Sequence, residues 1–170
     1  MFAMKIVVNT LSLAFLLSLL SNGISETIPL GVCDAMRQHQ NLDGKIVRIR
    51  GEYVATFEIV GLYGNCDGRA ILDGTPWPWA IHVTFANSSN SVEGLDPESL
   101  QSLRRVTAKP CPKCKRYVTL VGRFKSSGSN PAYLSSKGTP VHAGFGHLGV
   151  FGAEIETIAA ENIVEETPQK

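Results

Sequence analysis

The sequence predicts a mostly β domain with a helix in its second half. Residues 45–54 alternate apolar and charged side chains, which is the period of a half-buried strand. Residues 117–125 place their apolar side chains on one face in the same way. Between these two strands, Asp96, Pro97 and Glu98 form a helix start signal, because Asp is a common N-cap and Pro is favoured at the first helical position.

The other elements follow in chain order. A short helix is expected within residues 30–40, where apolar side chains recur at helical spacing. Gly51 interrupts the first strand, and a glycine there marks a bulge or a sharp bend. The further strands are expected at 57–63 with 69–72 (a strand or hairpin), 79–85, 117–125 and about 150–158. The acidic segment after 158 is expected to fray.

This order is a bent strand, two strands, a helix and two more strands. It is the order of an OB-fold, a five-stranded barrel whose helix lies between the third and fourth strands. We therefore predict an OB-fold-like barrel with a short N-terminal helix. A generic antiparallel sandwich is the main alternative.

Two segments also give the chain a resemblance to small exported bacterial proteins with an OB-like fold. They are residues 42–51 (LDGKIVRIRG) and 144–149 (GFGHLG), and the resemblance covers about residues 30–165. OB-folds bind nucleic acid, sugar or other proteins, or serve as structural modules. The resemblance therefore implies the fold and leaves the ligand open.

The N-terminal segment has the pattern of a secretory signal peptide. Lys5 precedes an apolar run at residues 6–20, and a short polar stretch with small residues leads to Ser25. The run is shorter than the roughly 20 apolar residues that span a bilayer, so we expect cleavage after Ser25 (or after Gly23) and no membrane span in the mature chain. The predicted organisation is a signal peptide at 1–25, a single exported domain at 26–166, periplasmic or secreted, and a disordered tail at 167–170.

Charge is unevenly distributed along the chain. There are 16 Lys+Arg against 15 Asp+Glu, and residues 99–153 hold nine bases and no acid, whereas residues 26–98 hold ten acids and five bases. A nucleic-acid binder would use the basic segment 104–125. Removal of Lys5 with the signal peptide leaves 15 bases and 15 acids, which favours mutual neutralisation on folding, so nucleic acid is not the expected partner.

The four cysteines allow two disulfides or one metal site. For an exported chain we prefer two structural disulfides, Cys33–Cys66 and Cys111–Cys114, among the three possible connectivities. The alternative is a zinc site on the Cys111-Pro112-Lys113-Cys114 knuckle, with Cys33 and Cys66 as its further ligands.

Two other interpretations of the knuckle fit less well. His142 and His147 have acceptable mutual spacing as ligands, but 27 residues separate Cys114 from His142, beyond the roughly 12–15 of a zinc-finger pattern. A redox-active pair should open a helix, whose N-terminus stabilises a thiolate. The residues that follow Cys114 have the pattern of a strand instead.

Trp77, Trp79 and His147 form the candidate binding surface. Aromatic side chains on such barrels stack on bases or sugars. They also cover barrel ends as packing groups, which is the interpretation that we favour for the two tryptophans. His147 lies in a glycine-rich stretch and is either a ligand-binding or a hydrogen-bonded structural histidine.

No catalytic residue is predicted. The Gly-x-Ser-x-Gly motif is absent from the sequence, and the carboxylates of Glu154 and Glu156, which share one strand face, are expected to be solvated. We therefore expect a non-enzymatic binding or structural module without a cofactor, whose partner is a protein, a glycan or a small ligand. Zinc binding and oligonucleotide binding are the alternatives.

Overall fold

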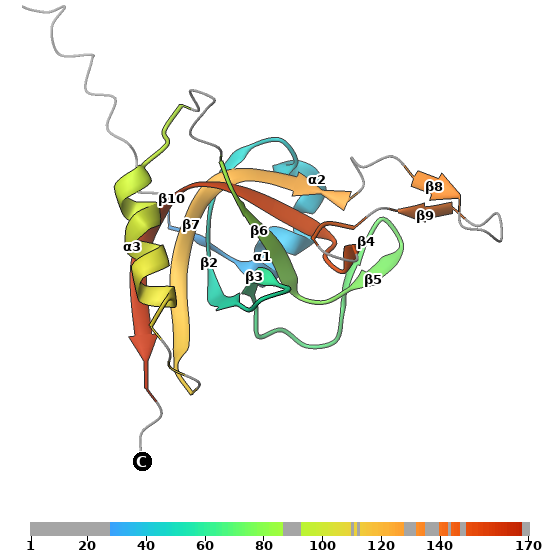
Figure 1. The fold of residues 1–170 in the computed structure, drawn as a ribbon. Helices are drawn as coiled ribbons and strands as arrows, with labels where there is room; N and C mark the ends of the chain where they lie inside the picture. The colour runs from blue at the N-terminus through green and yellow to red at the C-terminus, as the bar shows by residue number, and fades with distance from the viewer. Residues whose placement is uncertain are drawn as a thin grey trace, which may run out of the picture.

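A closed β-barrel forms the centre of the computed structural model (Figure 1). The described residues are 28–86, 93–109, 111, 113–127, 132–134, 140–142, 144–146 and 149–167. The helices are α1 (Val32–Arg37), α2 (His39–Leu42) and α3 (Pro97–Thr107). The strands are β1 (Leu30–Gly31), β2 (Ile46–Ala55), β3 (Val60–Tyr63), β4 (Ala70–Leu72), β5 (Thr75–Trp77), β6 (Ala80–Phe85), β7 (Lys115–Ser126), β8 (Ala132–Leu134), β9 (Pro140–His142) and β10 (Ala153–Glu166).

Five strands of the described chain close the barrel. β2 pairs with β3, β3 with β6, β6 with β10, β10 with β7, and β7 returns to β2. The pairing of β6 with β10 is parallel and the other four are antiparallel. The helix α3 falls between the third and fourth barrel strands. The mostly β, OB-fold-like barrel that the sequence predicts is therefore confirmed, with α1 and α2 at the expected N-terminal position.

The first barrel strand bends at the predicted glycine. β2 pairs with β7 from Ile46 to Glu52 and with β3 from Glu52 to Ala55, so it serves both halves of the barrel. A Cβ on Gly51 would lie 2.8 Å from the carbonyl oxygen of Tyr63. Only glycine therefore lets the backbone pack this closely at the changeover.

Alternation along the strands builds the core. Every barrel strand contributes a fully buried aliphatic side chain: Ile49, Leu62, Ile81, Leu120 and Ile155. Their neighbours in sequence point outward, as the period of two requires. The inner face is therefore filled by packing, and chemistry is confined to the outer face and the barrel ends.

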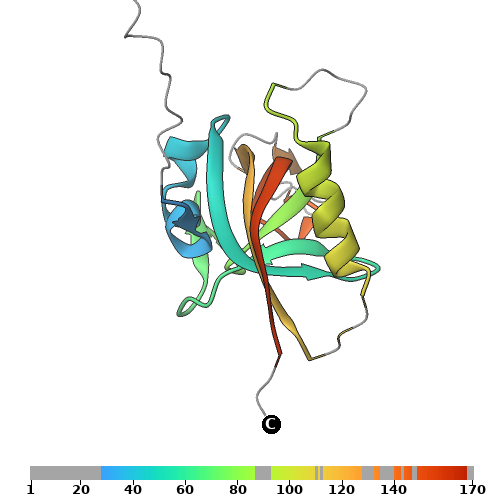
Figure 2. The same cartoon turned by 90° about the vertical axis from the view of Figure 1, so that its left-hand side faces the viewer.

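The helices lie on opposite sides of the barrel, with α1 and α2 on one side and α3 on the other (Figure 2). The side chain of Asp96 accepts hydrogen bonds from the backbone N–H groups of Glu98 and Ser99, both at 3.1 Å, so the predicted start of α3 is confirmed. Leu100 and Leu103 are the buried residues of this helix. Among the described residues, no helix is both long enough and apolar enough to cross a bilayer.

The last strand is longer than predicted. It was expected to end near Ile158, yet β10 continues to Glu166. Acidic side chains of its second half pair with bases on other strands: Glu165 lies 2.9 Å from Nε of Arg116 on the adjacent β7, and Glu161 pairs with Arg48 on β2, the strand beyond β7. These cross-strand ion pairs replace the apolar alternation that ends at residue 158, so the acidic segment does not fray there.

The pairing of β10 with β7 brings the oppositely charged segments of the sequence together. β10 runs antiparallel to β7, which brings the acidic end of the chain against the basic segment. The expected neutralisation therefore takes place strand against strand. A separate basic face along β7 would require that the basic side chains of β7 have no carboxylate partners.

Candidate functional site

Polar side chains of three adjacent strands, β6, β10 and β7, form a row on the outside of the barrel. Gly61, His82, Glu154 and Lys125 are successive cross-strand partners, and directly opposed residues point to the same face. Nδ1 of His82 lies 3.0 Å from Oε2 of Glu154, and Nζ of Lys125 donates to Oε1 of Glu154 at 3.2 Å. Lys125 also lies 3.2 Å from Oε2 of Glu156. We call His82, Lys125, Glu154 and Glu156 the outer-face cluster.

Contacts within the cluster shift the pKa values of Glu154 and Lys125 toward their charged forms. The hydrogen bond with His82 lowers the pKa of Glu154, burial opposes this, and the bond from Lys125 lowers it further. Burial lowers the pKa of Lys125, but its bonds to Glu154 and Glu156 outweigh that effect, and the net shift is upward. The side chains of His82 and Glu154 are only 18% and 14% exposed, against 38% and 37% for Lys125 and Glu156. The inner pair therefore orients the two side chains that reach solvent.

Two aromatic rings and two glycines complete this face. The ring of Phe151 lies 5.5 Å from that of His82 and 6.3 Å, edge-on, from that of Tyr63. A Cβ on Gly146 would lie 3.0 Å from Cδ2 of His82, and one on Gly61 would lie 2.9 Å from Cε2 of Tyr63. Small residues at these two positions let the rings and the loop before β10 lie directly on the sheet. Tyr63 remains partly exposed at the edge of the cluster.

A second group of reactive side chains lies in the loop between α3 and β7. Cys111 and Cys114 form a disulfide with a Cα–Cα distance of 5.4 Å. Their sulfur atoms and a carboxylate oxygen of Glu165 all lie within 4.8 Å of one another. Arg116 connects the loop to β10. Its Nη2 donates to the carbonyl of Lys109 at 2.7 Å, and its Nε donates to Glu165 on β10 at 2.9 Å. As free thiols, the cysteines with this carboxylate would offer three ligands to a metal ion.

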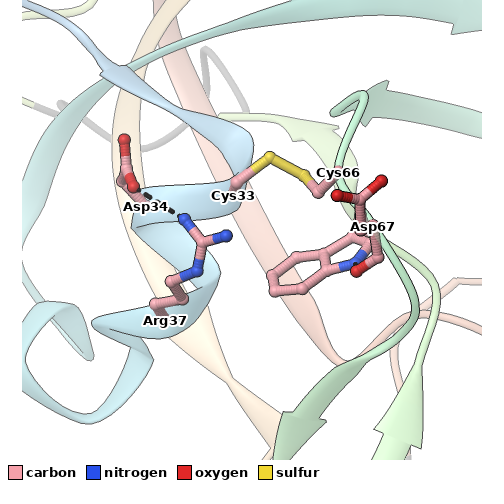
Figure 3. The surroundings of a disulfide bond; sticks show 6 residues. Cys33, Asp34, Arg37, Cys66 and Asp67 are labelled. Carbon is pink, nitrogen blue, oxygen red and sulfur yellow. Dashed lines mark hydrogen bonds and ion pairs between the residues drawn. A yellow bond between two sulfur atoms is a disulfide. The ribbon is translucent and has the colours of Figure 1, made fainter.

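The other two cysteines are bonded to each other. Cys33 on α1 and Cys66 after β3 are bridged with a Cα–Cα distance of 6.2 Å (Figure 3). The connectivity is thus the one that the sequence analysis prefers. The four cysteines do not converge on one point, because within the described chain the group with metal-ligand spacing contains Glu165 in place of Cys33 and Cys66. His147 and the side chain of His142 lie outside the described residues.

The tryptophans are packing groups. Trp77 is 7% exposed, and a Cβ on Gly152 would lie 2.5 Å from its Cγ, so the indole lies directly on this backbone. Trp77 on β5 therefore packs into the core, which is the interpretation favoured for it from the sequence. Trp79 is half-buried; its Nε1 donates to the carbonyl of Asp67 at 3.0 Å and the guanidinium of Arg37 lies 5.3 Å from its ring.

The cation over Trp79 belongs to the surroundings of the first disulfide. In Figure 3, Arg37 and Cys33 project from the same helix, and Arg37 bonds to Asp34. The disulfide joins α1 to the segment after β3, and the contact of Arg37 with the ring joins α1 to Trp79. The exposed tryptophan surface is therefore occupied by the chain's own side chains.

His82 is a site residue that was not predicted from the sequence, and Glu154 is less solvated than expected. The alternation within β6 puts His82 on the outward face, which was the available signal. Its partner Glu154 lies 72 positions later on a parallel strand, so their contact depends on a pairing that the local pattern does not specify. The side chain of Glu154 is only 14% exposed.

Comparison of the chain with protein-family models, curated proteins and solved structures finds no match. The fold and the site define a closed, mostly β barrel with two disulfides and an ordered polar cluster on its outer face. Since one fold serves many functions, the function has to be inferred from the side chains of the site.

Proposed function

We propose that the protein is an exported, non-enzymatic binding module whose ligand surface is the outer-face cluster with Tyr63. The observation that carries the proposal is the ordered row His82–Glu154–Lys125 on β6, β10 and β7, the third, fifth and fourth barrel strands. In OB-like barrels the face of the second and third strands is where ligands bind, and these strands here carry Tyr63 and His82. Export is supported by the apolar N-terminal run and by the disulfides, which persist in oxidising compartments.

The charge of this surface favours a neutral, hydroxyl-rich ligand over a nucleic acid. Two carboxylates, Glu154 and Glu156, stand beside one ammonium group, Lys125, so a phosphate backbone would meet net repulsion. Carboxylate acceptors, an ammonium donor and the partly exposed ring of Tyr63 are the groups that bind sugar hydroxyls and sugar faces. We therefore propose an oligosaccharide as the ligand class.

The test is an amide NMR titration of the mature chain with cellohexaose, maltohexaose and chitohexaose. We expect at least one of these to shift the amides of β3 and β6 in a saturable manner. Glu156→Gln should weaken that binding about tenfold, since one charge-assisted hydrogen bond is lost. Glu98→Gln, an exposed carboxylate on α3, is the matched control and should leave the affinity unchanged.

Two results would overturn the proposal. One is the absence of saturable binding to all three hexasaccharides. The other is saturable, salt-sensitive binding of a single-stranded oligothymidine on the same amides, which would make the surface a nucleic-acid site.

A second candidate function is zinc binding at the knuckle. The spacing of Cys111, Cys114 and Glu165, within 4.8 Å, supports it. Zinc requires thiolates, so this function belongs to the reduced protein, in which water or a ligand group would take the fourth tetrahedral position.

Intact mass under native and denaturing conditions tests the zinc candidate. If the protein purified without reductant has the mass of the fully reduced chain minus four hydrogens and carries no metal, the cysteines form two structural disulfides in that preparation. The reduced protein should then be titrated with zinc, and binding that weakens in Glu165→Gln but not in Glu166→Gln supports the site. Equal affinities in these two variants would contradict the assignment of Glu165.

A further inference from the structure

A groove separates α3 from the end of β6, on a different part of the molecule from the outer-face cluster. Its volume is about 380 Å³, within the range of small-molecule sites. The apolar lining comes from Phe85, Leu95 and Leu100, and Gln101 and Arg104 add polar groups. Phe85 has the strand parity of the core residue Val83, so the groove lies at the end of the barrel interior.

Arg104 is the distinctive group of this groove. Its guanidinium lies over the ring of Phe85, with Cζ 5.4 Å from the ring centroid. Within the described part of the chain no carboxylate lies within 4.0 Å of it, whereas Arg48 and Arg116 both have such partners. Stacking on a ring engages the flat face of a guanidinium and leaves its N–H edge available.

The positive charge of Arg104 affects the pKa of a nearby tyrosine, Tyr53. Burial raises the pKa of Tyr53 to about 12, and the positive charge of Arg104 opposes that rise. Tyr53 is a core residue on β2. The guanidinium is thus close enough to the barrel end to act on groups there, and it lacks a carboxylate of the described chain that would neutralise it.

We propose that this groove binds a small organic anion with a flat apolar body, whose carboxylate accepts hydrogen bonds from Arg104 and Gln101. The apolar body would lie against Leu95, Leu100 and the edge of Phe85. Two features set this ligand class: an arginine without a carboxylate partner, held on a ring, and apolar side chains beside it. A bidentate carboxylate matches the fork of the guanidinium. The site is independent of the oligosaccharide surface proposed above.

The probe is 2-naphthoate, with its uncharged analogue 2-naphthamide, titrated into the full mature chain by isothermal calorimetry and amide NMR. We expect saturable binding with shifts confined to α3 and to the amides of Phe85 and Ala86. Naphthamide should bind about tenfold more weakly than naphthoate, because it lacks the charge that pairs with Arg104.

Neighbouring arginines on α3 provide a matched pair of variants. Arg104→Gln should reduce the affinity for naphthoate about tenfold and remove its advantage over naphthamide. Arg105→Gln, whose guanidinium bonds to Ser102 Oγ at 3.0 Å, should retain the wild-type affinity. The amide spectrum of each variant checks that it is folded.

Three results would overturn the proposal. Equal losses in the two arginine variants would show general electrostatic attraction, and equal affinities of naphthoate and naphthamide in the wild-type protein would remove the role of the charge. Lack of saturation at about 10 mM, a concentration that still detects a free energy of about 3 kcal/mol, would leave no site.

Discussion

The barrel body and the far ends of β7 and β10 are held by contacts of different kinds. In the body, Cys33–Cys66 joins segments 33 positions apart, and the largely buried Glu154 bonds to two side chains from other strands. At the far ends, which run on past the rest of the barrel in Figures 1 and 2, Cys111–Cys114 closes a single short loop and Glu165 pairs with Arg116 near the surface. We call these ends the ribbon.

This difference predicts which contacts stabilise the fold most and which can be lost at little cost in stability. A disulfide restricts the unfolded chain more when its loop is longer, and an ion pair contributes more when water is excluded. Both of these conditions hold in the body and fail at the ribbon. The reactive groups of the ribbon are therefore the ones that the fold can release, for example to bind a metal ion.

Removal of the body disulfide should have the largest effect. Cys33→Ser with Cys66→Ser removes a cross-link over a sequence separation of 33, which corresponds to about 4 kcal/mol of unfolding free energy. Urea unfolding of the oxidised proteins measures it. A loss below about 2 kcal/mol would show that the joined segments are held by other contacts, such as the stack of Arg37 on Trp79.

Removal of the ribbon disulfide should cost less. Cys111→Ser with Cys114→Ser opens a loop with a sequence separation of 3, for which the same relation gives about 2 kcal/mol. Arg116 continues to hold the loop to Lys109 and Glu165 in this variant. Urea unfolding under identical conditions should rank the two variants, with intact mass confirming the remaining disulfide. A loss equal to that of the body pair would show that the two disulfides stabilise the fold equally despite their different loop lengths.

The body is also the region that local sequence patterns describe best. The period of two in β2 and β7 and the N-cap of α3 are local signals, so the barrel strands and the helix were predictable. The bend at Gly51 was predictable for the same reason. The disulfide between Cys33 and Cys66 was the preferred one of three connectivities, on the number of cysteines and the expectation of export.

The site depends on distant pairings, and these were not predictable from local patterns. His82 meets Glu154 only because β6 and β10 pair in one particular register. The second half of β10 has no apolar alternation and is ordered by ion pairs with other strands. In each case the decisive partner lies far along the chain.

Glu154→Gln tests the electrostatic part of the body. The variant keeps the shape of the side chain but loses the charge that bonds to His82 and Lys125, and we expect a loss of about 1.5 kcal/mol at pH 7. The pKa of Glu154 is lowered by folding, so its contribution is complete above the ordinary value of 4.5 and disappears as the pH falls through the lower folded pKa. Urea unfolding at pH 7 and pH 3 should show the difference from wild type shrinking in acid. A difference that is constant with pH would show that the carboxylate contributes by packing alone.

Glu165→Gln is the counterpart on the same strand and should have the smallest effect. The side chain of Glu165 is 35% exposed, and an ion pair of this kind contributes up to about 0.5 kcal/mol, which salt should screen. Arg116 keeps its bond to the carbonyl of Lys109, so the loop retains its anchor on the helix side. Urea unfolding at low and high salt measures the effect. If Glu165→Gln costs as much as Glu154→Gln at high salt, Glu165 is a structural residue, and releasing it to a metal ion would then weaken the ribbon itself. A small, salt-sensitive loss leaves this carboxylate free for that role.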